Sequence, residues 1–366
     1  MKEAVFLQEV KEIQLLKNAL TLLDWDSSTG MPEKSSPFRG EVEGYLTGLY
    51  FERSIGPVIQ EALAYFETRP EELSELGKLV FEKVKEEYAL NKNVPAERMQ
   101  EYVKVLNQAH TDWLKARAAQ DFGLLEETLT KVVAFQKEFI PYWQKEEKTP
   151  YDVLLNQFEP GMTVEKLDQV FDQVKQGIQE IRTVLAEKGT PPRTDFLSRK
   201  MTKEQQRRFV IGVVEQLGYD FSKGRLDDTV HPFMTALNRN DARITTRWEE
   251  NNFSMATFGV IHEAGHGMYE QNFDPKFDFT PLSEGASMGI HESQSLFNEI
   301  IIGSNRAFWQ KQYPFFQECV EGTFDDIAFE DFYASLKETK ASLIRIDSDS
   351  LTYPLHIIIR YEIEKM

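Results

Sequence analysis

The amino-acid sequence predicts a mainly α-helical protein. Apolar residues recur at intervals of three and four, with Lys and Glu between them, through long stretches such as 71–118 and 163–188. Alternation of β-branched and polar residues, which indicates strands, is rare, and residues 241–248 are its clearest case. With 366 residues, 41% of them hydrophobic, the chain can also bury a large core.

A break in the helical pattern divides the chain. Gly189, Pro191 and Pro192 fall close together, and neither residue type readily continues a helix. We therefore expect an amino-terminal helical lobe over residues 1–190 and a second half over residues 200–366.

The run His-Glu-Ala-Gly-His at 262–266 is the most informative motif of the second half. On a helix, positions four apart share a face, so His262 and His266 can direct two imidazoles at one point. Neutral imidazoles are good ligands for a zinc-like ion, and Glu263 lies where it can take a proton from a bound water. Histidine fills only 6 of 366 positions, which makes a chance match improbable. A purely structural pair of buried histidines is the alternative.

The residues around this motif fit a helix. Ser254 can cap its start, and Met255, Phe258 and Tyr269 share a stripe with the two histidines. A catalytic zinc site has three protein ligands, so a third should come from another element.

The next helical stretch, residues 283–303, offers three acids as the third ligand: Glu284, Glu292 and Glu299. Spacing alone does not choose among them. Glu284 falls in the first turn, where an acid stabilises the helix dipole, whereas Glu292 lies in the middle of the stretch. This placement favours Glu292.

Five motifs occur in order along the chain: HPF at 231–233, DARIT at 241–245, HEAGH at 262–266, HESQ at 291–294 and IRIDSD at 344–349. Together they resemble the carboxypeptidase Taq family of metallocarboxypeptidases. The segments LLDWDSSTGMP and PYDVLLNQFEPGMT in the amino-terminal half also resemble family segments, so the resemblance covers most of the chain. It implies a zincin-like helical fold with a deep groove, and removal of single residues from peptide carboxyl ends with broad specificity.

The resemblance also implies roles for individual residues. His262, His266 and Glu292 would bind one metal ion per chain, and Glu263 would be the general base. Zinc is the implied ion, with cobalt and manganese as alternatives. The first lobe would cover the groove, and the chain would form a homodimer.

A carboxypeptidase must bind the free carboxylate of its peptide substrate, and arginine does so with two parallel hydrogen bonds. Arg345 and Arg243 are the candidates. Arg345 could instead pair with Asp349, and Arg243 could be an ordinary surface charge. The resemblance favours Arg345.

Three further features could act on a bound peptide. His231 precedes a proline, which favours an extended backbone, and it could donate to the carbonyl oxygen under attack or only support the groove. Tyr353 could donate a phenolic hydrogen bond, although packing is the commoner role. The strand around Ile244 could pair with the peptide backbone.

The sequence departs from the family pattern in two ways. Ser348 stands where the family motif around Arg345 has alanine, and the family motif GxxQDxHW has no counterpart. The final stretch, residues 353–366, has a helical pattern without a Gly or Asn cap. We therefore expect the catalytic half to be incomplete at its carboxyl end, which puts the activity of this chain in doubt.

Composition limits the remaining possibilities. The formal net charge of −18 argues against binding to nucleic acid or to an anionic membrane surface. The single cysteine, Cys319, rules out an internal disulfide and suits a reducing compartment. Charged residues interrupt the amino-terminal apolar pattern, so no signal peptide is predicted and the cytoplasm is the expected location.

Three function classes therefore stay open. The first is a zinc carboxypeptidase that acts by attack of a metal-activated water on peptides with a free carboxyl end. The second is an endo-acting oligopeptidase with the same metal site. The third is a metal-binding but inactive chain.

Overall fold

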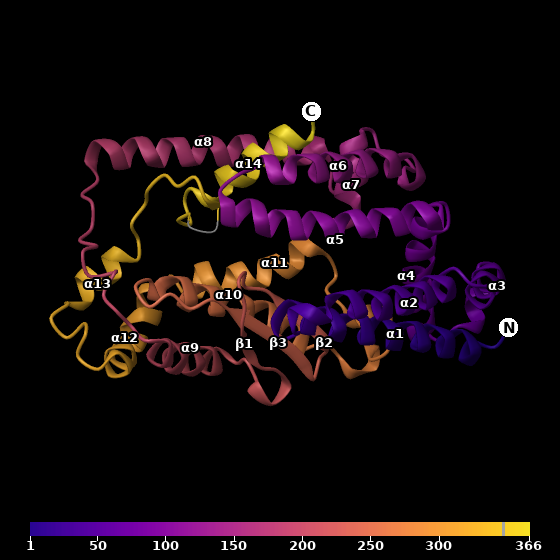
Figure 1. Cartoon of the computed structure of the whole chain (residues 1–366), viewed down its shortest axis with the longest axis horizontal. Coiled ribbons are helices and arrows are strands. Elements are labelled where there is room, and N and C mark those ends of the chain that lie inside the picture. The colour runs from indigo at the N-terminus through magenta and orange to yellow at the C-terminus, as the bar shows by residue number, and fades with distance from the viewer. Residues whose placement is uncertain (346–347) are drawn as a thin grey trace. The chain divides into compact units, whose positions relative to one another are not determined.

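The computed structural model describes residues 1–345 and 348–366. Ile346 and Asp347, which belong to the predicted motif 344–349, lie outside the described residues. The described chain is mainly helical with a small three-stranded sheet, which confirms the predicted fold class (Figure 1).

The chain divides into two compact units. One consists of Met1–Glu9 and Phe51–Val164, and the other of Val10–Tyr50 and Glu165–Met366. The predicted division into an amino-terminal lobe over residues 1–190 and a second half over residues 200–366 stays a prediction.

The first unit is built from helices alone. Its elements are the start of α1 (Glu3–Thr29), the end of α2 (Ser36–Ser54), α3 (Pro57–Phe66), the 3-10 turn η2 (Pro70–Glu72), α4 (Glu75–Asn91), α5 (Ala96–Ala119), α6 (Gly123–Trp143) and α7 (Pro150–Phe158). Phe6, Phe66 and Phe81 form an aromatic cluster, with ring centroids 6.0, 6.4 and 6.5 Å apart. A reciprocal capping box between Thr149 and Asp152 fixes the start of α7.

The second unit contains the sheet, whose strand order is β1-β3-β2. Its strands are β1 (Leu226–Asp228), β2 (Met234–Asn238) and β3 (Asp241–Thr246). Strand β3 therefore confirms the predicted β element. It pairs in parallel with β1 along Ile244–Thr246 and antiparallel with β2 along Asp241–Ile244. Pairing of this strand with a peptide backbone stays a prediction.

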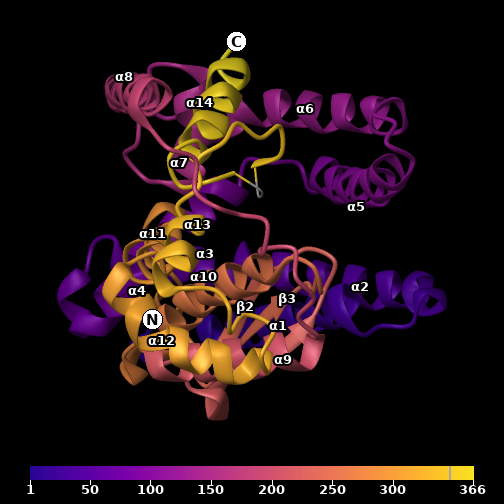
Figure 2. The ribbon, with the colours of Figure 1, turned by 90° about the vertical axis from the view of Figure 1, so that its left-hand side faces the viewer.

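The second unit contains most of α1 and α2, over residues 10–29 and 36–50. Its other helices are α8 (Val164–Lys188), α9 (Lys203–Leu217), α10 (Phe253–Gln271), α11 (Met288–Leu296), the π-helix η6 (Phe297–Ile302), α12 (Arg306–Val320), α13 (Phe329–Ser335) and α14 (Tyr353–Glu364). Short 3-10 turns occupy Glu33–Ser35, Phe221–Lys223, Pro275–Phe277 and Pro281–Ser283. Helix α10 packs against β3 and α9, and α12 packs against α9 (Figures 1 and 2).

The core of the second unit is rich in aromatic side chains. Trp309 and Phe316 of α12 are fully buried and pack on Phe253 of α10, Phe209 of α9 and Phe332 of α13. Each such ring removes a large apolar area from water, so this core fixes α10 in place.

The predicted break after the long helix α8 is present. The helix ends at Lys188, directly before the Gly-Pro-Pro region. A capping box between Thr202 and Gln205 then starts α9. Gly218, which follows the last residue of α9, has a φ of 112°, a conformation that glycine adopts without strain.

The described residues include no helix that combines the length and the apolar character needed to cross a membrane.

Candidate metal centre

Helix α10 carries the His-Glu-Ala-Gly-His motif. It begins at Phe253 after Asn252, one residue before the predicted cap Ser254, which therefore lies within the helix. Val260 and Ala264 of α10 are fully buried in the core. A Cβ atom at Gly267 would lie 2.7 Å from the ring of Tyr219, so glycine allows α10 to pack this closely.

The two histidines of α10 and a carboxylate of α11 converge. One ligand atom each from His262, His266 and Glu292 lie within 4.8 Å of one another. The Nε2 atoms of His262 and His266 are 3.7 and 3.3 Å from Oε2 of Glu292. The structure thus brings together the three residues that the sequence predicts as metal ligands.

The donor set and its spacing fit a zinc-like ion. Two imidazoles and one carboxylate are a ligand set of catalytic zinc sites, which leave a further position open. For tetrahedral coordination with bonds of about 2.1 Å, ligand atoms are about 3.4 Å apart. The distances from Glu292 to the two histidines are close to this value.

A close approach of two helices places Glu292. A Cβ atom at Gly265 of α10 would lie 2.7 Å from the carbonyl oxygen of Gln294 and 2.7 Å from Cα of Ser295, both on α11. Helix α11 begins at Met288, later than predicted, because the side chain of Ser287 accepts a hydrogen bond from the backbone N–H of Ile290 and caps it.

The other two acids that the sequence offers have different partners. Glu284 binds the ammonium of Lys17 through both oxygens, at 2.5 and 2.7 Å. Oε2 of Glu299 lies 2.7 Å from Nδ1 of His262. A metal-binding histidine commonly donates its second N–H to a carboxylate, which fixes the ring orientation. Glu299 is placed for that contact with His262.

The local electrostatics affect the three candidate ligands differently. Burial lowers the pKa of His266. Burial also opposes charge on His262, but its hydrogen bond to Glu299 and the nearby carboxylates outweigh burial and raise its pKa. The hydrogen bond from His266 lowers the pKa of Glu292. Glu292 is therefore kept in the ionised form that binds a metal.

Glu263 is buried beside this cluster, with 7% of its surface exposed. Burial raises its pKa to about 7, and the charges of Glu292 and Glu299 contribute to the rise. A carboxyl group with such a pKa can both accept and release a proton near neutral pH.

Arg345 and Tyr353 contact each other. Nη1 of Arg345 donates to the hydroxyl of Tyr353 at 2.8 Å, and the guanidinium lies 5.7 Å from the ring centroid. Burial raises the pKa of Tyr353, and the charges of Glu292 and Glu299 add to this effect. Tyr353 therefore lies within electrostatic range of the candidate metal centre.

Asp349, which the sequence offers as an alternative partner of Arg345, accepts hydrogen bonds from the backbone N–H groups of Leu351 and Thr352.

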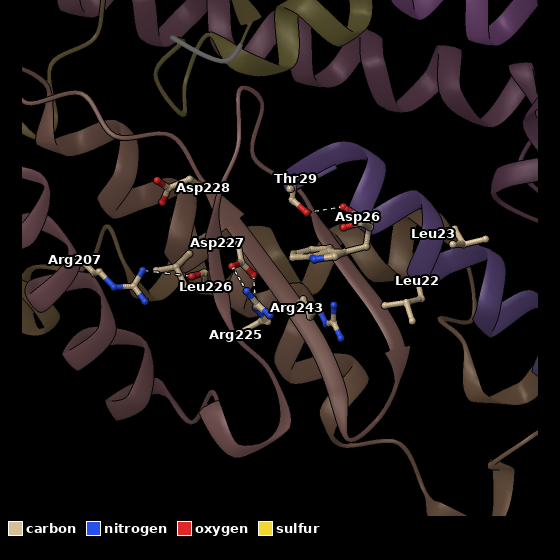
Figure 3. A pocket seen from close by; sticks show the side chains of 12 residues that line it. Leu22, Leu23, Asp26, Thr29, Arg207, Arg225, Leu226, Asp227, Asp228 and Arg243 are labelled. Carbon is tan, nitrogen blue, oxygen red and sulfur yellow. Dashed lines mark hydrogen bonds and ion pairs between the residues drawn. The ribbon is translucent and has the colours of Figure 1, made fainter. Parts of the chain in front are cut away.

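Arg243 lines a pocket of about 790 Å³ (Figure 3). Its guanidinium donates to both oxygens of Asp241 at 2.8 Å and lies 5.5 Å from the ring centroid of Trp25. Side chains alternate along β3, and Ile244 points toward α10 near Gly267. Arg243 therefore points to the opposite face of the sheet.

His231 is exposed and precedes β2. The nearby Phe233 donates its backbone N–H to Oγ1 of Thr245 at 2.8 Å, and its ring lies 5.4 Å from that of Trp25. The HPF and DARIT motifs therefore meet at the sheet.

Sequence reasoning assigned no role to His291 and Glu270, which lie beside the cluster. Two signals could have indicated them. His291 directly precedes the favoured ligand Glu292, and Glu270 lies one helical turn after His266.

The fold and the site define a helical metallopeptidase of the His-Glu-x-x-His type. Residues 5–366 match the family model described as carboxypeptidase Taq (M32) metallopeptidase. The chain therefore belongs to this family, and it is a metal-dependent carboxypeptidase.

Relatives and solved structures agree with this assignment. The chain is 45% identical to carboxypeptidase 1 of Bacillus subtilis over 99% of its own length and 72% of that protein. It is 33% identical to thermostable carboxypeptidase 1 of Thermus thermophilus over 97% of its own length and 71% of that protein. The crystal structure of the M32 carboxypeptidase from Deinococcus radiodurans superposes with a TM-score of 0.90 at 33% identity, covering 97% of this chain and 71% of the other.

Proposed function

We propose that this chain removes single residues from the free carboxyl ends of peptides, with zinc held by His262, His266 and Glu292. The observation that carries the proposal is the convergence of these three side chains, with ligand atoms within 4.8 Å, beside the buried carboxyl group of Glu263. When bound, a divalent cation supplies an activated water and polarises the carbonyl under attack.

Glu263 is the proposed general base and then the general acid. It accepts a proton from the attacking water and delivers that proton to the leaving amine. Burial raises the pKa of Glu263 to about 7 in the metal-free chain, so the protonated form that the second step requires is accessible in this environment.

Arg345 is the proposed binder of the substrate carboxylate, and Tyr353 is its partner. Support comes from the 2.8 Å hydrogen bond between them and from the action of the Glu292 charge on Tyr353. Arg243 is the second candidate. It is less well supported, because Asp241 already occupies its guanidinium. For His231 we propose a hydrogen bond to the carbonyl oxygen of the bond that is cleaved.

Peptide digestion followed by mass spectrometry, together with the metal content of the purified chain, tests this function. Loss of one residue at a time from the carboxyl end, with one zinc per chain, supports a carboxypeptidase. Internal cuts would show an oligopeptidase instead. A chain that binds one metal ion but cleaves nothing would be a binding protein without turnover.

The preference for zinc over cobalt and manganese rests on the donor set alone. Metal content and reactivation of the metal-free chain with each ion check it.

The homodimer and the cytoplasmic location are proposals as well. The family resemblance supports the dimer, and analytical ultracentrifugation checks it. The single cysteine, Cys319, which is buried, suits a reducing compartment. Cell fractionation checks the location.

A further inference from the structure

The imidazole of His291 lies between His266 and Glu270. Its Nδ1 is 2.6 Å from Nδ1 of His266, and its Nε2 is 2.8 Å from Oε1 of Glu270. Glu270 belongs to α10 and is buried, with 6% of its surface exposed. Both nitrogens of His291 are therefore in contact with polar groups inside the protein.

Metal binding by His266 determines the direction of both hydrogen bonds. This step rests on the proposed function, in which Nε2 of His266 binds the ion. The proton of a neutral imidazole then sits on Nδ1 of His266, which donates to Nδ1 of His291. His291 can accept there only with its own proton on Nε2, and this N–H donates to Glu270. Each donor in the series meets one acceptor.

The packing around His291 holds its ring in this place. A Cβ atom at Gly285 would lie 2.6 Å from Cδ2 of His291 and 3.4 Å from the ring of Tyr269. The ring of Tyr269 meets that of His291 at 81°, and its hydroxyl accepts a hydrogen bond from the backbone N–H of Ala286. The absent side chain at Gly285 thus leaves the space that the His291 ring occupies.

We propose that His291 and Glu270 are positioning residues that hold the imidazole of His266 with its Nε2 free for the metal ion. The two ligand histidines are then supported in different ways. Glu299 contacts His262 directly, whereas His266 is connected to its carboxylate through a second imidazole. Both residues act through His266, and neither is among the three candidate ligands.

Zinc affinity, measured by competition with a chromophoric chelator, tests the proposal. His291→Phe keeps a ring but removes the acceptor for His266, and Glu270→Ala removes the acceptor for His291. Each change should weaken zinc binding by about 10- to 100-fold. Because the contacts are in series, the double variant should bind zinc no more weakly than His291→Phe alone. Glu270→Gln keeps an acceptor oxygen and should restore most of the affinity.

Two further variants separate positioning from a general loss of structure. Gly285→Ala removes no polar atom but displaces the His291 ring, so it should also weaken zinc binding. His110→Phe is the matched control, since His110 is exposed in the first unit and stacks on Trp113. It should leave zinc affinity unchanged. Unfolding of each metal-free variant shows whether the fold is intact.

The experiment distinguishes failure of this proposal from failure of the metal site. If His266→Ala binds zinc as tightly as the parent chain, the proposed ligand set is wrong. If His266→Ala loses zinc while His291→Phe and Glu270→Ala bind it normally, only the positioning proposal is overturned. The positioning proposal would also be overturned if the losses of zinc affinity in the two single variants multiplied in the double variant, since that would mean that the two residues act independently.

Discussion

The carbonyl oxygen of Gln294 occupies the space that a side chain at Gly265 would need, since a Cβ atom there would lie 2.7 Å away. This contact joins the helix that carries two candidate ligands to the helix that carries the third. The fourth residue of the His-Glu-Ala-Gly-His motif therefore has a structural reason to be glycine. It sets the separation of the two helices.

Gly265→Ala should separate α10 from α11. The opposing atoms belong to the backbone of Gln294 and Ser295 and cannot rotate away, so we expect a destabilisation of about 1–3 kcal/mol. Zinc binding should weaken as well, because Glu292 moves with α11. Urea unfolding of the metal-free chain and a zinc titration measure the two effects.

A matched glycine variant gives the control for this prediction. Gly177 lies within α8, and a Cβ atom there would meet no atom within 4 Å. Gly177→Ala should therefore stabilise the chain by about 0.5–1 kcal/mol through helix propensity and leave zinc affinity unchanged. Equal stability of Gly265→Ala and the parent would show that the two helices adjust without cost.

Glu263→Gln should keep the metal and lose the reaction. Glutamine has nearly the same size as glutamate but cannot accept the proton, so we expect kcat to fall by about 100- to 10,000-fold. Zinc content should remain that of the parent, because Glu263 is not among the three candidate ligands. A variant that hydrolyses peptides at the parental rate would show that Glu263 is not the base.

The pKa of Glu263 also predicts how stability depends on pH in the metal-free chain. Burial raises this pKa from 4.5 to about 7, so the folded chain holds a proton that the unfolded chain releases. The folded state therefore loses stability as the pH rises from about 4.5 to about 7. The free energy of unfolding of Glu263→Gln, relative to that of the parent, should therefore rise by about 2–3 kcal/mol between pH 4 and pH 8.

Urea unfolding in the presence of a chelator at both pH values measures this gain. Other titrating groups are shared by the two proteins, so the difference between them isolates Glu263. A difference in stability that does not change with pH would mean that Glu263 has the same pKa in the folded chain as in the unfolded chain.

The sequence predicted those parts of the site that depend on local geometry. Helical spacing alone brings His262 and His266 to one face, and the strand at 241–246 shows the expected alternation. The choice of Glu292 also required chemistry, because Glu284 and Glu299 lie in the same predicted helical stretch, residues 283–303.

The rest of the site depends on contacts between distant segments. Lys17 removes Glu284 from the set of possible ligands, although the two residues are 267 positions apart. The contact of His291 with Glu270 exists only because α11 packs on α10. Strand β1 has only three residues, too few to show an alternating pattern, so the central position of β3 could not be predicted.

Kinetics with paired substrates test the role of Arg345. A guanidinium that binds the terminal carboxylate promotes cleavage of peptides with a free carboxyl end, and it has little effect on the same peptides with an amidated end. Arg345→Ala should therefore lower kcat/KM for the free-acid peptide by about 10- to 100-fold, which corresponds to the free energy of a hydrogen bond between charged groups. Cleavage of the amidated peptide should change much less. Tyr353→Phe removes the hydroxyl that holds the guanidinium and should show the same selectivity with a smaller loss.

Arg243→Ala is the comparison that decides between the two arginines. Its guanidinium is held by Asp241 on the face of β3 away from α10, so its loss should affect both substrates equally or not at all. A selective loss for free-acid peptides in Arg243→Ala, with no selectivity in Arg345→Ala, would reverse the assignment. Equal damage to both substrates by Arg345→Ala would instead mean that Arg345 supports the site through Tyr353, because a purely structural role does not distinguish a carboxylate from an amide.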